Sequence, residues 1–347
     1  MKLDVRTAQP YSVFIENGVL DRVGEIARES RKPGAKAMVI SDSNVFPLYG
    51  ERVKASLERA GFPASTFVFP AGEPQKQIST VCGMYRALSE AGFTRTDFIV
   101  TLGGGVAGDM GGFAAATFLR GMAFLQVPTT LLAQVDASVG GKTGVDLPFG
   151  KNLVGAFHQP FAVAADPQAL KSLPEHFFRD GMGEVIKYGC IDDAPLFGAL
   201  EAGTALQDLE DVLARCVRSK IRFVEEDTRD TGRRMILNFG HTFGHALEKL
   251  HNFQELSHGE AVGIGMVMAC QVGEKLGVTP AGTADRVREV LKRYGLPIQD
   301  RFTWGQVVEA TALDKKSDGS TLRLILLSKI GESRIHPIER EELLGLL

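Results

Sequence analysis

The sequence predicts an α/β N-terminal domain with a parallel sheet, followed by a mainly α-helical C-terminal domain. In the first half, short apolar runs that end in turn residues alternate with amphipathic segments. In the second half most segments have helical spacing. The chain has 347 residues, more than a single hydrophobic core usually supports. We therefore expect two domains, residues 1–171 and 172–347, with the functional site in their cleft.

The expected elements of the first domain follow the order of βαβ units. Strands are predicted at residues 36–42, 64–70, 97–105 and 123–130, with helices at 51–61 and near 78–92. Helices of the second domain are predicted within 173–189, 208–227, 240–250, 258–277 and 284–295, often separated by Gly or Pro. One late strand is expected at residues 322–328.

Composition excludes several classes of protein. Hydrophobic residues make up 44% and charged residues 23%, and the net charge of −3 provides no field that would attract nucleic acid or anionic lipid. Apolar stretches such as residues 261–270 are too short to cross a bilayer, and the N-terminus lacks a secretory signal. The four cysteines are far apart, which favours buried thiols in a reducing compartment. We expect a cytoplasmic protein without nucleic-acid or membrane partners.

A glycine-rich turn follows the third predicted strand. Residues 103–108, GGGVAG, match GxGxxG, whose backbone N–H groups can bind a pyrophosphate at a helix N-terminus. Alone the match is weak, because these glycines could simply permit close strand–helix packing. Polar residues after the two preceding strands favour a nucleotide site: Asp42 and Asn44 after the first, and Glu73 and Lys76 after the second.

Four of the seven histidines lie between residues 237 and 265. His241 and His245 are spaced i,i+4, so both would lie on one face of a helix, as in a two-histidine metal site. The HExxH glutamate is absent, and His258 or Glu184 could supply a third ligand. His251 and Glu260 carry no such signal and are interpreted as ordinary surface or core residues.

Basic residues occur in glycine-rich or apolar surroundings, which is typical of an anion pocket for phosphate and carboxylate. They are Lys142, Lys151, Lys187, Lys220, Arg234, Lys315 and Lys316.

Six segments follow one another along the chain: GGGVAGD, VPTTLLAQVDASVGGKTGVD, GKNLVGAFHQP, GEVIKYG, LNFGHTFGHA and HGEAV. Together they closely resemble the motifs of the 3-dehydroquinate synthase family of sugar-phosphate cyclases. The resemblance covers nearly the whole chain. It implies NAD and a divalent metal, zinc or alternatively cobalt. It also implies conversion of 3-deoxy-D-arabino-heptulosonate 7-phosphate, a phosphorylated seven-carbon sugar acid, into 3-dehydroquinate and phosphate in the shikimate pathway.

The resemblance implies roles for individual residues. The metal ligands would be Glu184, His241 and His258, while His245 would face the substrate as a hydrogen-bonding or proton-relay group. Catalytic or substrate-binding roles would fall to Asp136, Lys142, Lys151, Asn152, Lys187, Lys220, Arg234, Asn238 and Lys316. Arg120 would reach the phosphate from the partner subunit of a homodimer. Nucleotide contacts would fall on Asp42, Asn44, Glu73, Lys76, Gly104, Gly105, Asp109, Thr129 and Thr130.

One segment departs from the family pattern, and several related activities compete. A glutamate that the family commonly has near Phe177 is missing, so one nucleotide-side contact lacks its family residue, whereas the metal site is unaffected. Cyclases that form valiolone-type, aminodehydroquinate or deoxy-inosose products are the nearest alternatives, and the predicted carboxylate-binding groups favour dehydroquinate synthase, although an aminodehydroquinate enzyme could keep them. A metal-dependent polyol or glycerol dehydrogenase is less compatible with the anion-binding lysines. A non-enzymatic nucleotide-binding module is less compatible with the predicted metal ligands.

Overall fold

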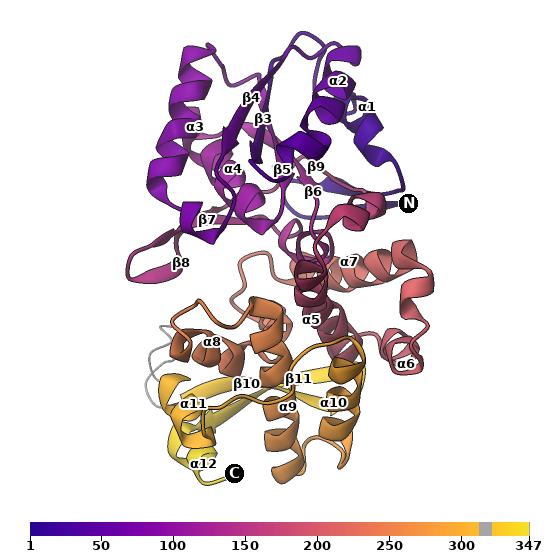
Figure 1. Cartoon of the computed structure of the whole chain (residues 1–347), viewed down its shortest axis with the longest axis vertical. Coiled ribbons are helices and arrows are strands. Elements are labelled where there is room, and N and C mark those ends of the chain that lie inside the picture. The colour runs from indigo at the N-terminus through magenta and orange to yellow at the C-terminus, as the bar shows by residue number, and fades with distance from the viewer. Residues whose placement is uncertain (312–320, 347) are drawn as a thin grey trace. The chain divides into compact units, whose positions relative to one another are not determined.

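The computed structural model describes residues 1–311 and 321–346. The chain folds into two compact units, Met1–Leu173 and Pro174–Leu347, and their boundary lies two residues beyond the expected one. Figure 1 shows the sheet with its helices in the first unit and the mainly helical second unit. No helix among the described residues is long and apolar enough to span a membrane.

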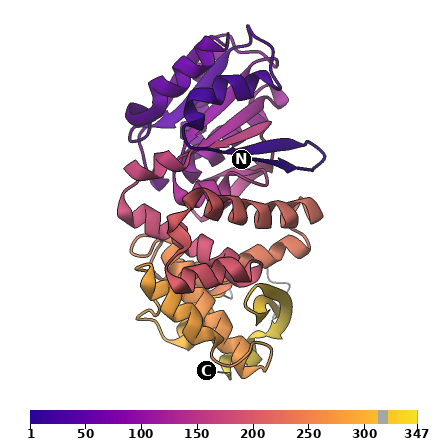
Figure 2. The ribbon, with the colours of Figure 1, turned by 90° about the vertical axis from the view of Figure 1, so that its right-hand side faces the viewer.

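The first unit contains a seven-stranded sheet in the order β1-β2-β9-β6-β5-β3-β4. All neighbouring strands are parallel except β1 and β2, which form an N-terminal antiparallel hairpin (Figure 2). The strands are β1 (Lys2–Val5), β2 (Tyr11–Ile15), β3 (Ala37–Asp42), β4 (Ala64–Phe69), β5 (Phe98–Gly103), β6 (Ala123–Pro128) and β9 (Ala162–Ala165). The four strands predicted from apolar runs correspond to β3, β4, β5 and β6.

Helices cover both faces of this sheet. Because side chains alternate along a strand, Val39, Val100 and Leu125 pack on one face, whereas Ile40, Ile99 and Phe124 pack on the other. The first core includes residues of α1 (Val23–Arg28) and α2 (Glu51–Arg59), and the second includes residues of α3 (Ile78–Glu90) and α4 (Gly105–Thr117). Each helix is thereby fixed against a buried strand.

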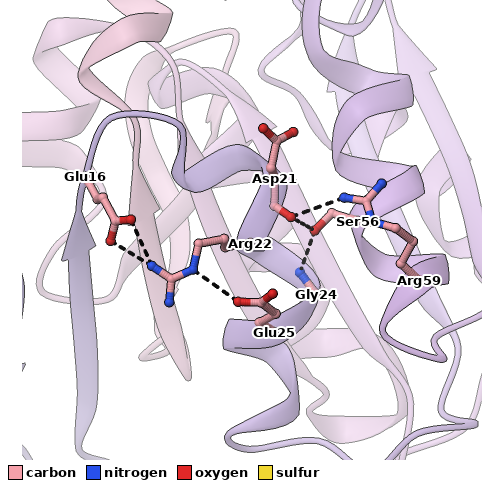
Figure 3. Close-up of polar contacts among 7 residues, drawn as sticks. All are labelled: Glu16, Asp21, Arg22, Gly24, Glu25, Ser56 and Arg59. Atoms are coloured by element: carbon pink, nitrogen blue, oxygen red, sulfur yellow. Dashed lines mark hydrogen bonds and ion pairs between the residues drawn. The ribbon is translucent and has the colours of Figure 1, made fainter.

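Ser56 connects α1 and α2 on the first face (Figure 3). Its hydroxyl accepts a hydrogen bond from Gly24 N at 3.1 Å and donates to the carbonyl of Asp21 at 2.7 Å. A Cβ at Gly24 would lie 2.1 Å from the Ser56 carbonyl oxygen, so only glycine allows this approach. Arg22 pairs nearby with Glu16 and Glu25 at the surface.

A second antiparallel hairpin in this unit was not predicted. It consists of β7 (Lys142–Leu147) and β8 (Gly150–Phe157), so the glycine-rich segments that carry Lys142 and Lys151 are paired strands.

The second unit is mainly helical and also contains one hairpin. The helices are α5 (Glu175–Ile191), α6 (Ala194–Ala202), α7 (Leu209–Glu226), α8 (His241–Leu250), α9 (His258–Lys275), α10 (Thr283–Arg293), α11 (Trp304–Ala310) and α12 (Arg340–Leu344). The expected late strand is β10 (Thr321–Lys329), and β11 (Glu332–Glu339), which was not predicted, pairs with it.

The cysteine prediction is wrong at one position. Cys190, Cys216 and Cys270 are buried, but Cys82 is exposed because it lies on the solvent side of α3.

Candidate functional site

The glycine turn and its polar neighbours meet at the carboxyl edge of the parallel sheet. Strand β3 ends at Asp42, β5 ends at Gly103, and β6 is followed by Thr129 and Thr130. Helix α4 begins at Gly105, directly after β5. The register pairs Gly103 with Pro128 and Ser41 with Leu102, which brings these strand ends side by side. Asp42 and Thr130 therefore lie beside the glycines that precede α4.

The geometry at this edge is compatible with a bound phosphate. A Cβ at Gly103 would lie 2.8 Å from the Ala107 Cβ, whereas one at Gly105 would meet its nearest neighbour at 3.9 Å. The turn therefore needs glycine for packing at Gly103, but leaves the backbone open at Gly105, where the helix N-terminus attracts anions. Asp42 Oδ1 accepts from the backbone N–H groups of Asn44 and Val45, at 2.8 and 3.0 Å, which fixes the adjacent turn.

Lys76 connects the glycine-turn helix to the β7–β8 hairpin. Its ammonium lies 2.6 Å from Asp109 Oδ2 and donates to Asn152 Oδ1 at 2.7 Å. Only 6% of its side chain is exposed. Burial disfavours the ammonium, but Asp109 and Glu73 outweigh it and raise the pKa of Lys76. Asn152 has a left-handed backbone (φ 53°) and donates from its own N–H to Asp146 at 2.7 Å. An expected nucleotide residue thus contacts an expected substrate residue.

In the second unit, one carboxylate and two imidazoles form a group that could hold a metal. They come from the middle of α5 (Glu184), the first position of α8 (His241) and the first position of α9 (His258). Nε2 of each histidine lies 3.5 Å from Glu184 Oε1, and the three donor atoms lie within 4.8 Å of one another. This donor set suits Zn²⁺ or a similar divalent ion, with a coordination position left for another ligand.

Glycines bring the three ligand-bearing helices close together. A Cβ at Gly265 of α9 would lie 2.0 Å from the carbonyl oxygen of Gly240, directly before α8. A Cβ at Gly183 of α5 would lie 2.6 Å from the carbonyl oxygen of Gly259 on α9. Any larger residue at either position would push the backbones apart. Asp180 reinforces the second contact, because its Oδ1 accepts from Gly259 N at 2.5 Å.

The pKa values of the two imidazoles are shifted in opposite directions. Burial and the neighbouring Lys187 ammonium hold the pKa of His241 well below its usual range, so its imidazole is neutral and able to ligate. Desolvation acts in the same direction on His258, but the carboxylates of Glu184 and Glu248 outweigh it and raise the pKa of His258 to about 10. Lys187 forms a buried ion pair with Glu184.

Buried cations lie on elements of the same unit. Lys187 is on α5, Lys220 on α7, and Arg234 on the short 3₁₀ segment Arg233–Asn238 that also carries Asn238. At most 5% of each of these three cationic residues is exposed. The Arg234 guanidinium donates to the Thr228 carbonyl at 2.9 Å, and its backbone N–H donates to Asp227 at 3.2 Å. Buried positive charge of this kind suits anionic ligands.

The remaining predicted residues that the structure describes lie in the first unit. Lys142 is exposed on β7, Lys151 is half-buried on β8, and Asp136 lies in a short helical turn at Ala133–Ala137. Arg120 is exposed and has a left-handed backbone (φ 67°). Lys315 and Lys316 lie outside the described residues. Lys142 and Lys151 therefore belong to one hairpin, and their contacts with a substrate stay a prediction.

His245 and Phe177 lie near the ligand-bearing elements. His245 is exposed, with its ring centroid 5.4 Å from that of His241 and 6.0 Å from that of His258. Phe177 is exposed in the first turns of α5 and contacts the ring of His176.

Two polar residues near the ligands were not predicted from the sequence. Glu248 is buried on α8, with Oε1 3.6 Å from His258 Nδ1, and its i,i+3 spacing from His245 was the available signal. Asp180 lies four residues before Glu184, one helical turn away.

His251 and Glu260, both interpreted as ordinary residues, have defined partners. The two ring nitrogens of His251 lie 3.1 Å from Glu255 and 2.8 Å from Asp300, and the side chain is 7% exposed. Glu260 accepts from Ser257 N at 3.0 Å in the capping box that begins α9.

Known proteins match the chain over nearly its whole length. The family models described as 3-dehydroquinate synthase N-terminal and C-terminal match residues 66–180 and 181–317. The 3-dehydroquinate synthase of Clostridium acetobutylicum is 46% identical over 337 residues, which cover 96% of this chain and 94% of that protein.

Solved structures of sugar-phosphate cyclases share the fold. A 2-deoxy-scyllo-inosose synthase complexed with carbaglucose-6-phosphate, NAD⁺ and Co²⁺ has a TM-score of 0.88 at 26% identity, covering 100% of this chain and 99% of its own. The 2-epi-5-epi-valiolone synthase of Streptomyces hygroscopicus, with NAD⁺ and Zn²⁺ bound, has a TM-score of 0.85 at 27% identity, covering 96% and 94%. By its matched models and relatives, this chain belongs to the 3-dehydroquinate synthase family.

Proposed function

We propose that the chain converts 3-deoxy-D-arabino-heptulosonate 7-phosphate into 3-dehydroquinate and phosphate. The observation that carries the proposal is the group formed by Glu184, His241 and His258 in a unit that also buries three cations, in a chain of this family. The identity of 46% to a 3-dehydroquinate synthase, against 26–27% to two cyclases that form other products, favours this activity over the related ones.

The two cofactors would be held in different units. We assign NAD to the first unit, through Asp42, Asn44, Glu73, Lys76, Gly104, Gly105, Asp109, Thr129 and Thr130. We assign a divalent metal, zinc or alternatively cobalt, to Glu184, His241 and His258 in the second. When bound, NAD would accept a hydride and later return it, so that the overall reaction has no net redox change, and the metal would act as a Lewis acid on the oxygen of the carbon that is oxidised.

The residues of the second unit meet specific needs of this chemistry. The phosphate leaves as an anion, and buried Lys220 and Arg234 provide positive charge that can bind phosphate or carboxylate oxygens without reorganisation. The planar guanidinium of Arg234 is suited to bind a planar carboxylate through two hydrogen bonds. Lys187, held beside Glu184, limits the negative charge near the ligands. His245 is exposed and is not one of the three proposed ligands, which is compatible with carrying a proton to or from the substrate.

The other assignments remain part of the proposal. Asp136, Lys142, Lys151, Asn152, Asn238 and Lys316 are proposed to contact the substrate, and Arg120 is proposed to reach the phosphate of a neighbouring copy in a homodimer. A cytoplasmic location is proposed as well. Sedimentation analysis would test the dimer, and an Arg120→Ala variant mixed with an inactive partner variant would test the shared contact.

The central test is a reaction of purified protein with the substrate, catalytic NAD and Zn²⁺. Phosphate release, the carbocyclic product and NADH are followed together, with the product identified by mass spectrometry. We expect equal amounts of phosphate and 3-dehydroquinate without accumulated NADH. Accumulation of NADH on polyols without phosphate release would instead support a dehydrogenase. A His241→Ala variant serves as the control for the metal group.

A further inference from the structure

Glu248 lies against the ring nitrogen of His258 that points away from the other ligands. His258 Nε2 is 3.5 Å from Glu184 Oε1, and His258 Nδ1 is 3.6 Å from Glu248 Oε1. The imidazole is therefore placed between two carboxylates, one from α5 and one from α8. Glu248 is buried, with 6% of its side chain exposed, so its charge has a cost unless a partner compensates it.

The two histidines of the group have different partners behind them. His241 Nδ1 lies 3.1 Å from the backbone carbonyl of Phe239. His258 has a carboxylate in the corresponding place. A carboxylate or carbonyl that accepts the second N–H of a ligating imidazole fixes its tautomer and ring orientation and makes the metal-facing nitrogen a stronger donor. Unlike a backbone carbonyl, the partner of His258 can be removed by substitution.

The backbone around Glu248 holds this arrangement in place. The Glu248 carbonyl accepts from Phe253 N at 2.7 Å, in the turn that leads from α8 to α9. A Cβ at Gly244, one helical turn before Glu248, would lie 3.1 Å from the carbonyl oxygen of Ala261, so α8 and α9 are in close backbone contact beside the pair. The separation of Glu248 and His258 is therefore set by the packing of two helices.

We propose that Glu248 is a positioning residue for the metal group: its carboxylate accepts a hydrogen bond from the Nδ1–H of His258 and thereby orients Nε2 toward the site shared with Glu184 and His241. The inference rests on the proposed function, because it requires a metal at that group. A competing arrangement exists, since His245, Glu248 and His258 also have donor atoms within 4.8 Å of one another, and Glu248 could then be a ligand itself. Nε2 of both histidines faces the single oxygen Glu184 Oε1, whereas Glu248 faces Nδ1 on the other side of the His258 ring, and this arrangement favours the positioning role.

The test is the affinity and stoichiometry of Zn²⁺ and Co²⁺ for metal-free protein, measured by chelator competition and by the visible spectrum of the Co²⁺ form. We expect one bound equivalent in the parent protein, and a 10–100-fold higher dissociation constant for Glu248→Ala. Glu248→Gln keeps an acceptor oxygen and should recover part of the affinity. Both variants should still bind one equivalent of Co²⁺, with shifted absorption bands.

Glu274→Gln is the matched control. Glu274 is a partly buried carboxylate on the same helix as His258 and accepts from Ala284 N at 2.8 Å, far along α9 from the ligands. It should change the thermal unfolding midpoint without changing metal affinity. Parent-like affinity in both Glu248 variants would overturn the positioning role. So would an equal loss of affinity in the control, or a second equivalent of metal in the parent that Glu248→Ala removes. Failure of the parent protein to bind metal would instead count against the proposed function.

Discussion

Replacing Gly265 by alanine should disrupt the metal group without removing any ligand. The new Cβ would lie 2.0 Å from the Gly240 carbonyl oxygen and 2.8 Å from Gly244 N, whereas ordinary contact begins at 3.4 Å. The two helices must therefore separate by about 1.4 Å along the shorter contact. His241 is the first residue of α8 and His258 the first of α9, so this separation moves one ligand away from the other.

The displacement is large compared with the tolerance of a metal site. Ligand distances that fit a metal vary by only about 0.2 Å. We expect the dissociation constant for Zn²⁺ to rise at least about 10-fold, the smallest effect typical of disturbed ligand support. Overpacking should cost about 1–3 kcal/mol in free energy of unfolding, offset by about 1 kcal/mol from the better helix propensity of alanine.

Chelator competition on the metal-free protein measures the affinity, and denaturant unfolding measures the stability. Gly263→Ala is the matched control, because the closest neighbour of a Cβ there is the flexible Leu291 side chain at 3.1 Å, and the Pro297 carbonyl oxygen is at an ordinary contact distance of 3.8 Å. It should bind metal like the parent. A Gly265→Ala protein that folds and binds Zn²⁺ with the parent affinity would refute the view that this backbone contact sets the ligand spacing.

Three further substitutions test individual residues. His241→Ala should abolish tight metal binding and activity together while circular dichroism shows a retained fold; an active, metal-free variant would reject its role as a ligand. Arg234→Lys replaces a buried planar guanidinium by an ammonium and should weaken transition-state binding by about 1.5–3 kcal/mol, measured as a decrease in kcat/KM. Desolvation opposes ionisation of Asp227, but N–H donors including Gly232 at 2.6 Å outweigh it and lower the pKa of this carboxyl. A carboxyl whose pKa is lowered in the folded state stabilises the fold at pH values above its unfolded-state pKa. The loss of unfolding free energy caused by Asp227→Asn should therefore be full at pH 7 and shrink below about pH 4. A deficit that is independent of pH would contradict this assignment.

The sequence predicted the elements whose pattern is local. The buried strands β3, β4, β5 and β6 are continuous apolar runs, and the long helices α7 and α9 have clear helical spacing and end signals. The β7–β8 hairpin was missed because its glycines and lysines are typical of a loop, and no residue of β8 is fully buried. Strand β11 was missed because it alternates polar residues with few apolar ones.

At the candidate metal group, the ligand residues could be predicted from the sequence, but the residues that hold them in place could not. The i,i+4 histidines and the family motifs indicated Glu184, His241 and His258, and the structure brings these three together. Nothing local in the sequence pairs Glu248 with His258 or Asp180 with Gly259, because each contact joins different helices. The significance of Gly265 likewise depends on the approach of Gly240, 25 positions earlier in the chain.

The strand order also determines when the sheet can be completed during synthesis. Strand β2 lies between β1 and β9, and its residue Ser12 pairs with Ala162, 150 residues later. At ribosomal rates of about 5–20 residues per second, the N-terminal hairpin waits roughly 8–30 s for its parallel neighbour. Strands β3 to β6 can pair during this interval, because their partners are close in sequence. The β1–β2 hairpin is therefore synthesised before strands β3 to β6 but joins the sheet after them, and until β9 is made it has an unpaired edge that could pair with another chain.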